Sequence, residues 1–238
     1  QTSDEDGKNK QLSKNSRWKP REQTTHGRMS TNFELPEPVL TWDAGVKLFL
    51  QLAGKRVSTC GNGFCWLYAT LAAVGALERP SRPTPRDYRM STVLLEEMHK
   101  RMRADRYLWM KDVPQHVKDT IFSMVAPQNS TDRGIYGGEC CHRIIAQILG
   151  ISIISFNGKL LRESTNLTPT ARTGSSSLLC YIPALGIRQS LRTLSLQEAI
   201  HELKQHKPDE PPPIVIEHNG CTGMGGHFTG WRRADIPE

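Results

Sequence analysis

The sequence contains no long apolar run. Its uninterrupted hydrophobic stretches are only a few residues long, whereas a helix that crosses a bilayer needs about 20 apolar residues. No basic segment leads into an apolar one near the N-terminus, so the pattern of a secretory signal is missing. We therefore expect a soluble protein of a reducing, intracellular compartment, the cytoplasm, with no membrane partner.

Cysteine is also scarce, with six residues in a chain of 238. Their uneven spacing and small number are unsuited to a disulfide framework in a chain of this length. No two of them have the two-residue gap of a zinc knuckle, so the sequence predicts neither a metal nor another cofactor. A scattered metal site is the alternative, with these candidate ligands: Cys60, Cys65, Cys140, Cys141, His142 and Cys221.

The sequence has no internal repeat and no glycine-rich phosphate loop, and its 37% hydrophobic content suffices for one domain with a substantial core. Residues 1–36 are polar and predict a disordered basic tail, followed by one domain over 37–238. The net charge of +7 is spread along the chain. We therefore expect a monomer that does not bind nucleic acid.

Apolar periodicity, capping residues and glycine or proline punctuation predict the elements of the domain. The predicted helices are Trp42–Ala53 with Thr41 as N-cap, Ser91–Ala104, Pro114–Met124, a helix between Gly138 and Gly150, and Leu196–Lys204 with Ser195 as N-cap. The predicted strands are Ile151–Phe156, Leu178–Ile182, Ile214–His218 and an antiparallel partner, His227–Trp231. Three prolines predict a surface loop over 79–86, and Asn157-Gly158 predicts a hairpin-type turn.

The most informative stretch is the glycine-rich turn that runs from Cys60 into an Ala- and Leu-rich segment with helical spacing. This pattern places Cys65 in the first turn of a buried helix, where free N–H groups and the helix dipole stabilise a thiolate. Gly61 and Gly63 allow backbone N–H groups to point at one spot and hold an oxyanion. The alternative is that Cys65 is a small apolar residue at the start of a core helix.

A cysteine nucleophile needs a base, which can lie far away in the sequence. His227 is the best candidate among eight histidines, because it follows Gly225-Gly226 and opens an apolar strand. His218 is the rival. The other histidines lie in the tail, beside the cysteines or on polar helix faces.

Three stretches resemble, in the same order, the motifs of the ovarian-tumour (OTU) family of cysteine proteases. Asn62-Gly63-Phe64-Cys65-Trp66-Leu67-Tyr68-Ala69 resembles Asp-Gly-Asn-Cys-Leu-Phe-Arg-Ala of that family. Tyr136-Gly137-Gly138-Glu139 resembles its Trp-Gly-Gly-Glu segment, and His227-Phe228-Thr229 resembles its terminal His-Tyr-Asn. The resemblance spans residues 41–231 and depends on these three anchors.

The resemblance implies an α+β, papain-like OTU fold with a small mixed β-sheet between helical layers. It also implies a deubiquitinase, a thiol protease that hydrolyses ubiquitin or ubiquitin-like conjugates without a metal. Cys65 would be the nucleophile and His227 the general base. The backbone N–H groups of Asn62, Gly63, Phe64 and Cys65 would form the oxyanion hole, and Trp66, Gly226, Phe228 and Trp231 would border the substrate.

Two departures from the family pattern concern the residue that orients the imidazole. Asn62 stands where the family often has Asp, and Thr229 stands where it often has Asn or Asp. Either side chain could accept the second ring N–H, but neither carries the charge that stabilises an imidazolium. Two alternatives therefore stay open: a ubiquitin-binding module that does not cleave, and a polyprotein-processing protease of a virus or mobile element, which Gln1 and the basic tail suggest.

Overall fold

The computed structural model describes residues 40–104, 115–129, 131–134, 138–163, 179–184, 192–205, 210–219 and 226–234. The chain divides into two units, residues 1–38 and 39–238, and the fold below is that of the second. The predicted disordered tail, 1–36, lies outside the described residues.

A six-stranded mixed sheet organises the domain, with the strand order β1-β6-β5-β2-β3-β4. The strands are β1 Lys55–Val57, β2 Ile153–Asn157, β3 Leu179–Ile182, β4 Arg192–Thr193, β5 Ile214–His218 and β6 Phe228–Arg232. β2 and β5 pair in parallel, and the other neighbours pair antiparallel. The predicted antiparallel pairing of the last two strands is confirmed, with His218 opposite Phe228.

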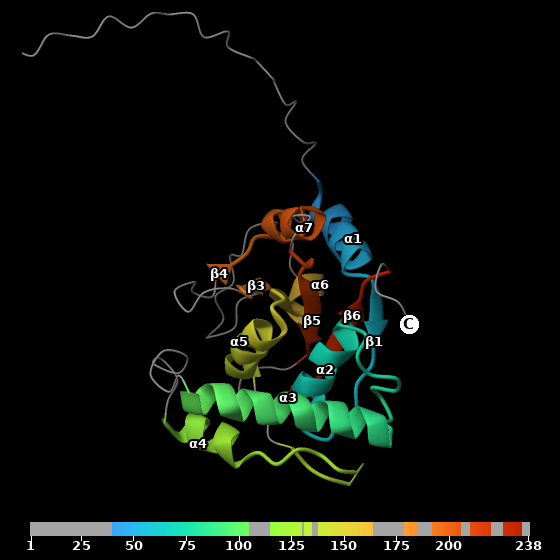
Figure 1. Ribbon diagram of the computed structural model, residues 1–238. Coiled ribbons are helices and arrows are strands. Elements are labelled where there is room, and N and C mark those ends of the chain that lie inside the picture. The colour runs from blue at the N-terminus through green and yellow to red at the C-terminus, as the bar shows by residue number, and fades with distance from the viewer. Residues whose placement is uncertain are drawn as a thin grey trace, which may run out of the picture. The chain divides into compact units, whose positions relative to one another are not determined.

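The described helices are α1 Trp42–Ala53, α2 Cys65–Ala73, α3 Pro85–Ala104, α4 Gln115–Ser123, α5 Gly138–Leu149, α6 Gly158–Glu163 and α7 Leu196–Lys204. They cover both faces of the sheet, with α2, α3 and α5 on one side and α1 and α7 on the other (Figure 1). None of the helices in the described ranges is long and apolar enough to cross a membrane.

Two apolar cores form because side chains alternate between the faces of each strand. In β5, Ile214 and Ile216 join the core under α2, α3 and α5, whereas Val215 joins the core under α1 and α7. The arrangement is a mixed α and β architecture with a small mixed sheet between helical layers. The expected fold class is therefore confirmed at this level.

Local capping signals identified two helices correctly. Thr41 Oγ1 accepts from the Ala44 N–H at 3.4 Å at the start of α1. Ser195 and Glu198 form a reciprocal capping box at the start of α7. The prediction that a helix begins at Cys65 is also confirmed.

Two local predictions were wrong. The helix expected from Ser91 begins at Pro85, inside the predicted loop, because proline is compatible with the first helical turn and Asp87 accepts the N–H of Thr84 at 2.9 Å. The expected hairpin turn after β2 is the start of α6, since Asn157 Oδ1 accepts from the N–H groups of Lys159 and Leu160 and caps that helix.

Candidate active site

Close packing of α2 on β6 sets the position of Cys65. All nine residues of α2 are buried, and a Cβ on Gly230 of β6 would lie 2.4 Å from the Ala69 carbonyl oxygen. Only glycine at position 230 allows the helix backbone to approach the strand this closely. The N-terminal end of α2, which begins with Cys65, thereby meets the start of β6.

The Cys65 sulfur contacts the residues on either side of His227. Its Sγ lies 3.9 Å from the Gly226 carbonyl oxygen and beside the Phe228 amide. Two segments about 160 residues apart in the sequence therefore meet at one place, as the motif order predicts. No hydrogen bond joins this sulfur to the His227 ring among the contacts of the described residues.

Burial dominates the protonation of Cys65, whose exposed fraction is 3%. Burial raises the pKa of the thiol, and the nearby amides of Phe228, Trp66 and Cys65 itself offset only part of this rise. The sequence-based expectation of a stabilised thiolate is therefore not met in this structure. The helix end supplies the expected N–H groups, but desolvation outweighs them.

The His227 ring is half-buried and lies against the segment that follows β1. Its Nε2 is 3.2 Å from Thr59 Oγ1. Burial lowers the pKa of His227, and the positive charge of Arg56 lowers it further. At neutral pH the site thus pairs a protonated thiol with a neutral imidazole, which suits general-base catalysis better than a preformed ion pair.

The turn before Cys65 is fixed by contact with the segment 131–134. Gly63 has φ = 89°, and a Cβ there would lie 2.2 Å from the Gly134 carbonyl oxygen. The Gly134 N–H donates to the Asn62 carbonyl oxygen at 2.7 Å. The Phe64 N–H donates to Asn62 Oδ1 at 3.3 Å, so one of the four predicted oxyanion donors is already engaged.

Neither residue predicted to orient the imidazole contacts its ring. The Oδ1 of Asn62 holds the turn, and the Asn62 side chain also interacts with Tyr68. The Oγ1 of Thr229 accepts from the Arg56 guanidinium at 3.4 Å. Both side chains therefore have other roles in this structure.

Three of the residues predicted to border the substrate are buried. Trp66 and Phe228 belong to the core on the α2 side of the sheet, and Trp231 belongs to the core on the opposite side. Gly226 is half-buried beside the Cys65 sulfur. Only Gly226 of this set keeps a place at the surface of the candidate site.

The sequence-based reasoning missed a buried carboxylate on the face of the sheet opposite Cys65. Glu217 on β5 is fully buried and accepts from Arg56 Nε at 2.8 Å, Arg162 at 3.0 Å and Trp231 Nε1 at 3.2 Å. With its amide group turned so that nitrogen faces the carboxylate, Asn219 donates to Glu217 at 3.0 Å. The only sequence signal was a charged residue directly after three β-branched strand residues.

His218, the rival base, is buried on the α2 side of the sheet with His142 of α5. The ring centroids of His142 and His218 lie 5.0 and 5.8 Å from that of Phe228. Burial lowers the pKa of His218 and lowers that of His142 to about 4. Both rings are therefore neutral at physiological pH.

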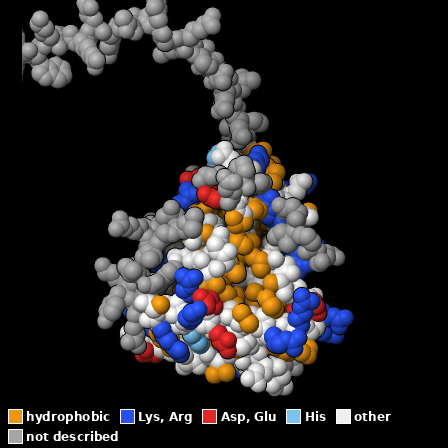
Figure 2. Space-filling model, viewed as in Figure 1, with side chains coloured by type: hydrophobic (Ala, Val, Ile, Leu, Met, Phe, Trp, Pro, Cys, Tyr) orange, Lys and Arg blue, Asp and Glu red, His pale blue; other side chains and the backbone are white. Residues whose placement is uncertain are grey.

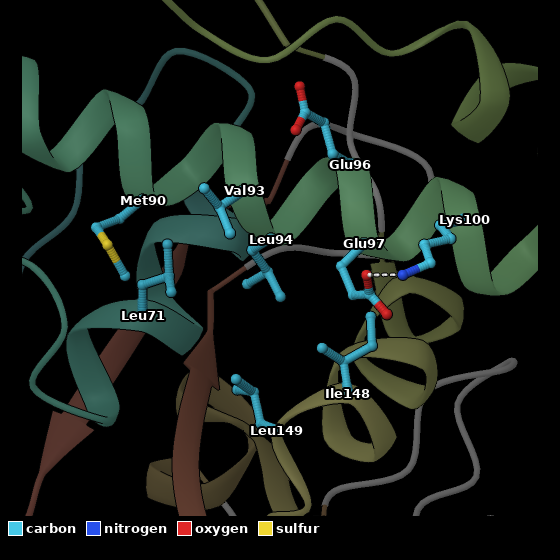
Figure 3. Close-up of a pocket in the computed structure, with 9 residues that line it drawn as sticks. All are labelled: Leu71, Met90, Val93, Leu94, Glu96, Glu97, Lys100, Ile148 and Leu149. Atoms are coloured by element: carbon cyan, nitrogen blue, oxygen red, sulfur yellow. Dashed lines mark hydrogen bonds and ion pairs between the residues drawn. The ribbon is translucent and has the colours of Figure 1, made fainter.

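A surface cavity of about 430 Å³ lies away from these residues. It is bordered by α3, the C-terminal end of α5 and Leu71 of α2, and the apolar Met90, Val93 and Leu94 point into it beside the Glu97–Lys100 ion pair (Figure 3). Charged side chains surround apolar ones on the face shown in Figure 2. None of the predicted catalytic residues lines this cavity.

No three His, Cys, Asp or Glu side chains within the described ranges are placed to hold a metal ion. The predicted Tyr136-Gly137 anchor, and Cys140 and Cys221 of the alternative metal site, lie outside the described side chains. The chain matches no protein-family model, no curated protein and no solved structure.

Proposed function

We propose that the protein is a cysteine-type deubiquitinase with an OTU-like fold, which hydrolyses bonds at the C-terminus of ubiquitin or a ubiquitin-like modifier. The observation that carries the proposal is the contact of the Cys65 sulfur with Gly226 and Phe228, the two neighbours of His227. This contact joins the first and last of the three motifs at the end of a buried helix. It brings a nucleophile and a base from distant segments to one site.

The reaction proceeds by acyl transfer. His227 takes the proton from the Cys65 thiol as the sulfur attacks the carbonyl carbon, and the oxyanion is held by N–H groups of the turn that precedes α2. The imidazolium returns this proton to the leaving amine, so the scissile C–N bond breaks and an acyl-thioester remains. His227 then takes a proton from water, whose oxygen attacks the thioester, and gives it to the departing sulfur.

Substrate must uncover the nucleophile before attack. Only 3% of the Cys65 surface is exposed, which leaves little room for a carbonyl carbon to approach its sulfur. We expect binding of the modifier's C-terminal tail to open the contact between the sulfur and Gly226. Removing the sulfur from the Gly226 carbonyl would also free it to face the imidazole.

The test is covalent capture. Ubiquitin and ubiquitin-like modifiers that carry an electrophile at the C-terminus should label the wild type and leave Cys65→Ala unlabelled, whereas Cys141→Ala, which changes another buried thiol, should still be labelled. A stable adduct with the probe needs the sulfur of Cys65. Labelling that persists in Cys65→Ala, or that is absent from the wild type with every modifier, would contradict the proposal.

A second candidate function is a ubiquitin-binding module that does not cleave. The buried, protonated state of Cys65 and the absence of a carboxylate acceptor for the described His227 ring favour it. Such a module would bind unmodified ubiquitin equally well as wild type and as Cys65→Ala. It would show no turnover of a fluorogenic ubiquitin conjugate at any pH.

A further inference from the structure

Thr59 is the residue whose side chain meets the His227 ring within the described part of the chain. It is buried, two residues after β1, and its Oγ1 lies 3.2 Å from His227 Nε2. The same hydroxyl oxygen makes a short hydrogen bond with the Phe228 carbonyl oxygen. These two contacts together determine where the protons lie.

A threonine hydroxyl has one proton to donate and lone pairs to accept with. A carbonyl oxygen can only accept, so the hydrogen bond to Phe228 uses the proton of Thr59. The contact with His227 must then run in the other direction, with Nε2–H donating to Thr59 Oγ1. In the neutral ring this leaves Nδ1 as the nitrogen without a proton, which is the one able to accept from a thiol.

We infer that Thr59 is the positioning residue of the catalytic pair: its hydroxyl, locked onto the Phe228 carbonyl, fixes His227 in the Nε2–H tautomer and leaves Nδ1 free to take the proton of Cys65. The inference deepens the proposed function and rests on it. When the S–H bond of Cys65 breaks and Nδ1–H forms, the Nε2–H bond to Thr59 stays in place. The hydroxyl therefore accepts the same proton before and after the transfer and need not reorient.

Thr59→Val tests the role, because valine keeps the shape of threonine and removes both hydrogen bonds. We expect kcat/KM for a ubiquitin conjugate to fall about tenfold, the worth of one hydrogen bond. The acid limb of its pH profile should move to lower pH, since the imidazolium loses an acceptor. Thr59→Ser, which restores the hydroxyl, should recover both the rate and the limb.

Thr70→Val provides a matched control. Thr70 is also buried and donates to a backbone carbonyl, that of Trp66 at 3.0 Å, but no ring donates to it. Thr70→Val should lower the stability somewhat and leave the pH profile of kcat/KM unchanged. A change in Thr59→Val that equals the change in Thr70→Val would show that position 59 is merely structural.

The tautomer gives a readout that needs no substrate. The ¹⁵N signals of the His227 ring in the full chain, assigned with His227→Gln, should show a proton on Nε2 in the wild type and a mixture of tautomers in Thr59→Val. A proton on Nδ1 in the wild type, or an unchanged ratio in Thr59→Val, would overturn the inference even if ubiquitin is cleaved. Conversely, the expected tautomers without any cleavage would show that Thr59 positions the ring and would reject the proposed function.

Discussion

Glu217 on one face of the central sheet and a set of buried polar atoms on the other face differ in their hydrogen bonding. On the face under α1, the Glu217 carboxylate is saturated by Arg56, Arg162 and Trp231. On the face under α2, several buried polar atoms of the described residues have no hydrogen-bond partner. These are His142 Nδ1, Ser155 Oγ and His218 Nδ1.

This difference distinguishes the ion cluster of Glu217 from the polar atoms on the side of the candidate site. A buried charge is tolerated only when its lone pairs are occupied, and Glu217 meets that condition. Unsatisfied polar groups weaken a fold and persist where chemistry needs them. All three lie on the side of the sheet that holds Cys65.

The largest effect is expected on catalysis, where substitutions of two histidines, His227 and His218, can be compared. His227→Ala should lower kcat/KM for a ubiquitin conjugate by about 10²–10⁴-fold, the usual contribution of a general base. His218→Ala removes a buried ring that packs against Phe228, and it should lower the rate far less. If the two effects are reversed at equal thermal stability, His218 is the base.

The next effect concerns the turn that carries the nucleophile. Gly63→Ala combines an unfavourable positive φ with a Cβ that would overlap the Gly134 carbonyl, and we expect it to destabilise the fold by about 3 kcal/mol and to abolish labelling by a ubiquitin probe. Gly61→Ala is the control, because a Cβ there meets nothing within 4 Å. Equal urea denaturation midpoints for the two variants would contradict this account.

A smaller change in stability is expected on the opposite face. Glu217→Gln weakens hydrogen bonds to two arginines and Trp231, and should cost about 2 kcal/mol of unfolding free energy, while Arg56 and Arg162 are exposed enough to regain water. Glu97→Gln, which removes a surface partner of Lys100 and Arg101, should leave the denaturation midpoint unchanged. If Glu217→Gln lowers kcat/KM for a ubiquitin conjugate while the protein is still fully folded, the Glu217 cluster on one face affects the proposed site on the other.

The last effect is a slope of stability with pH, whose change over any one pH unit is smaller than the changes above. Burial lowers the pKa of His142 from 6.5 to about 4, so between these values the unfolded chain binds more protons than the folded one. The part of the unfolding free energy that depends on neutral, buried His142 is therefore complete above pH 6.5. It is lost as the pH falls towards 4, by about 1.4 kcal/mol per pH unit.

His142→Gln should flatten that slope in urea titrations, whereas His116→Gln on the exposed face of α4 should leave it unchanged. His218 and His227, whose pKa values burial also lowers, add to the slope in the same direction. A slope that is identical in His142→Gln would show that His142 titrates normally.

The sequence predicted the elements whose signals are local. The hydroxyl caps Thr41 and Ser195 and the apolar spacing of α5 depend on residues within a few positions of one another. Pro85 and Asn157 misled the prediction, because each residue suits both a turn and the first turn of a helix.

The site was predicted only in part, for a physical reason. The motifs brought Cys65 and His227 to attention, but Thr59 lies outside every motif, and only the pairing of β1 with β6 places it near the ring. The partner of Thr229 was likewise set by a strand that is three residues long and has no periodic signal. Burial of Cys65, which decides its protonation, depends on the whole fold.

The length of β1 ties the two faces of the sheet together. Arg56 of this edge strand binds the Glu217 carboxylate. Thr59, two residues after the strand ends, contacts the His227 imidazole. A strand of three residues frays easily at a sheet edge. One local opening would release the Arg56–Glu217 ion pair and the His227 ring together, so amide hydrogen exchange at residues 55–59 should report how often the proposed site loses this arrangement.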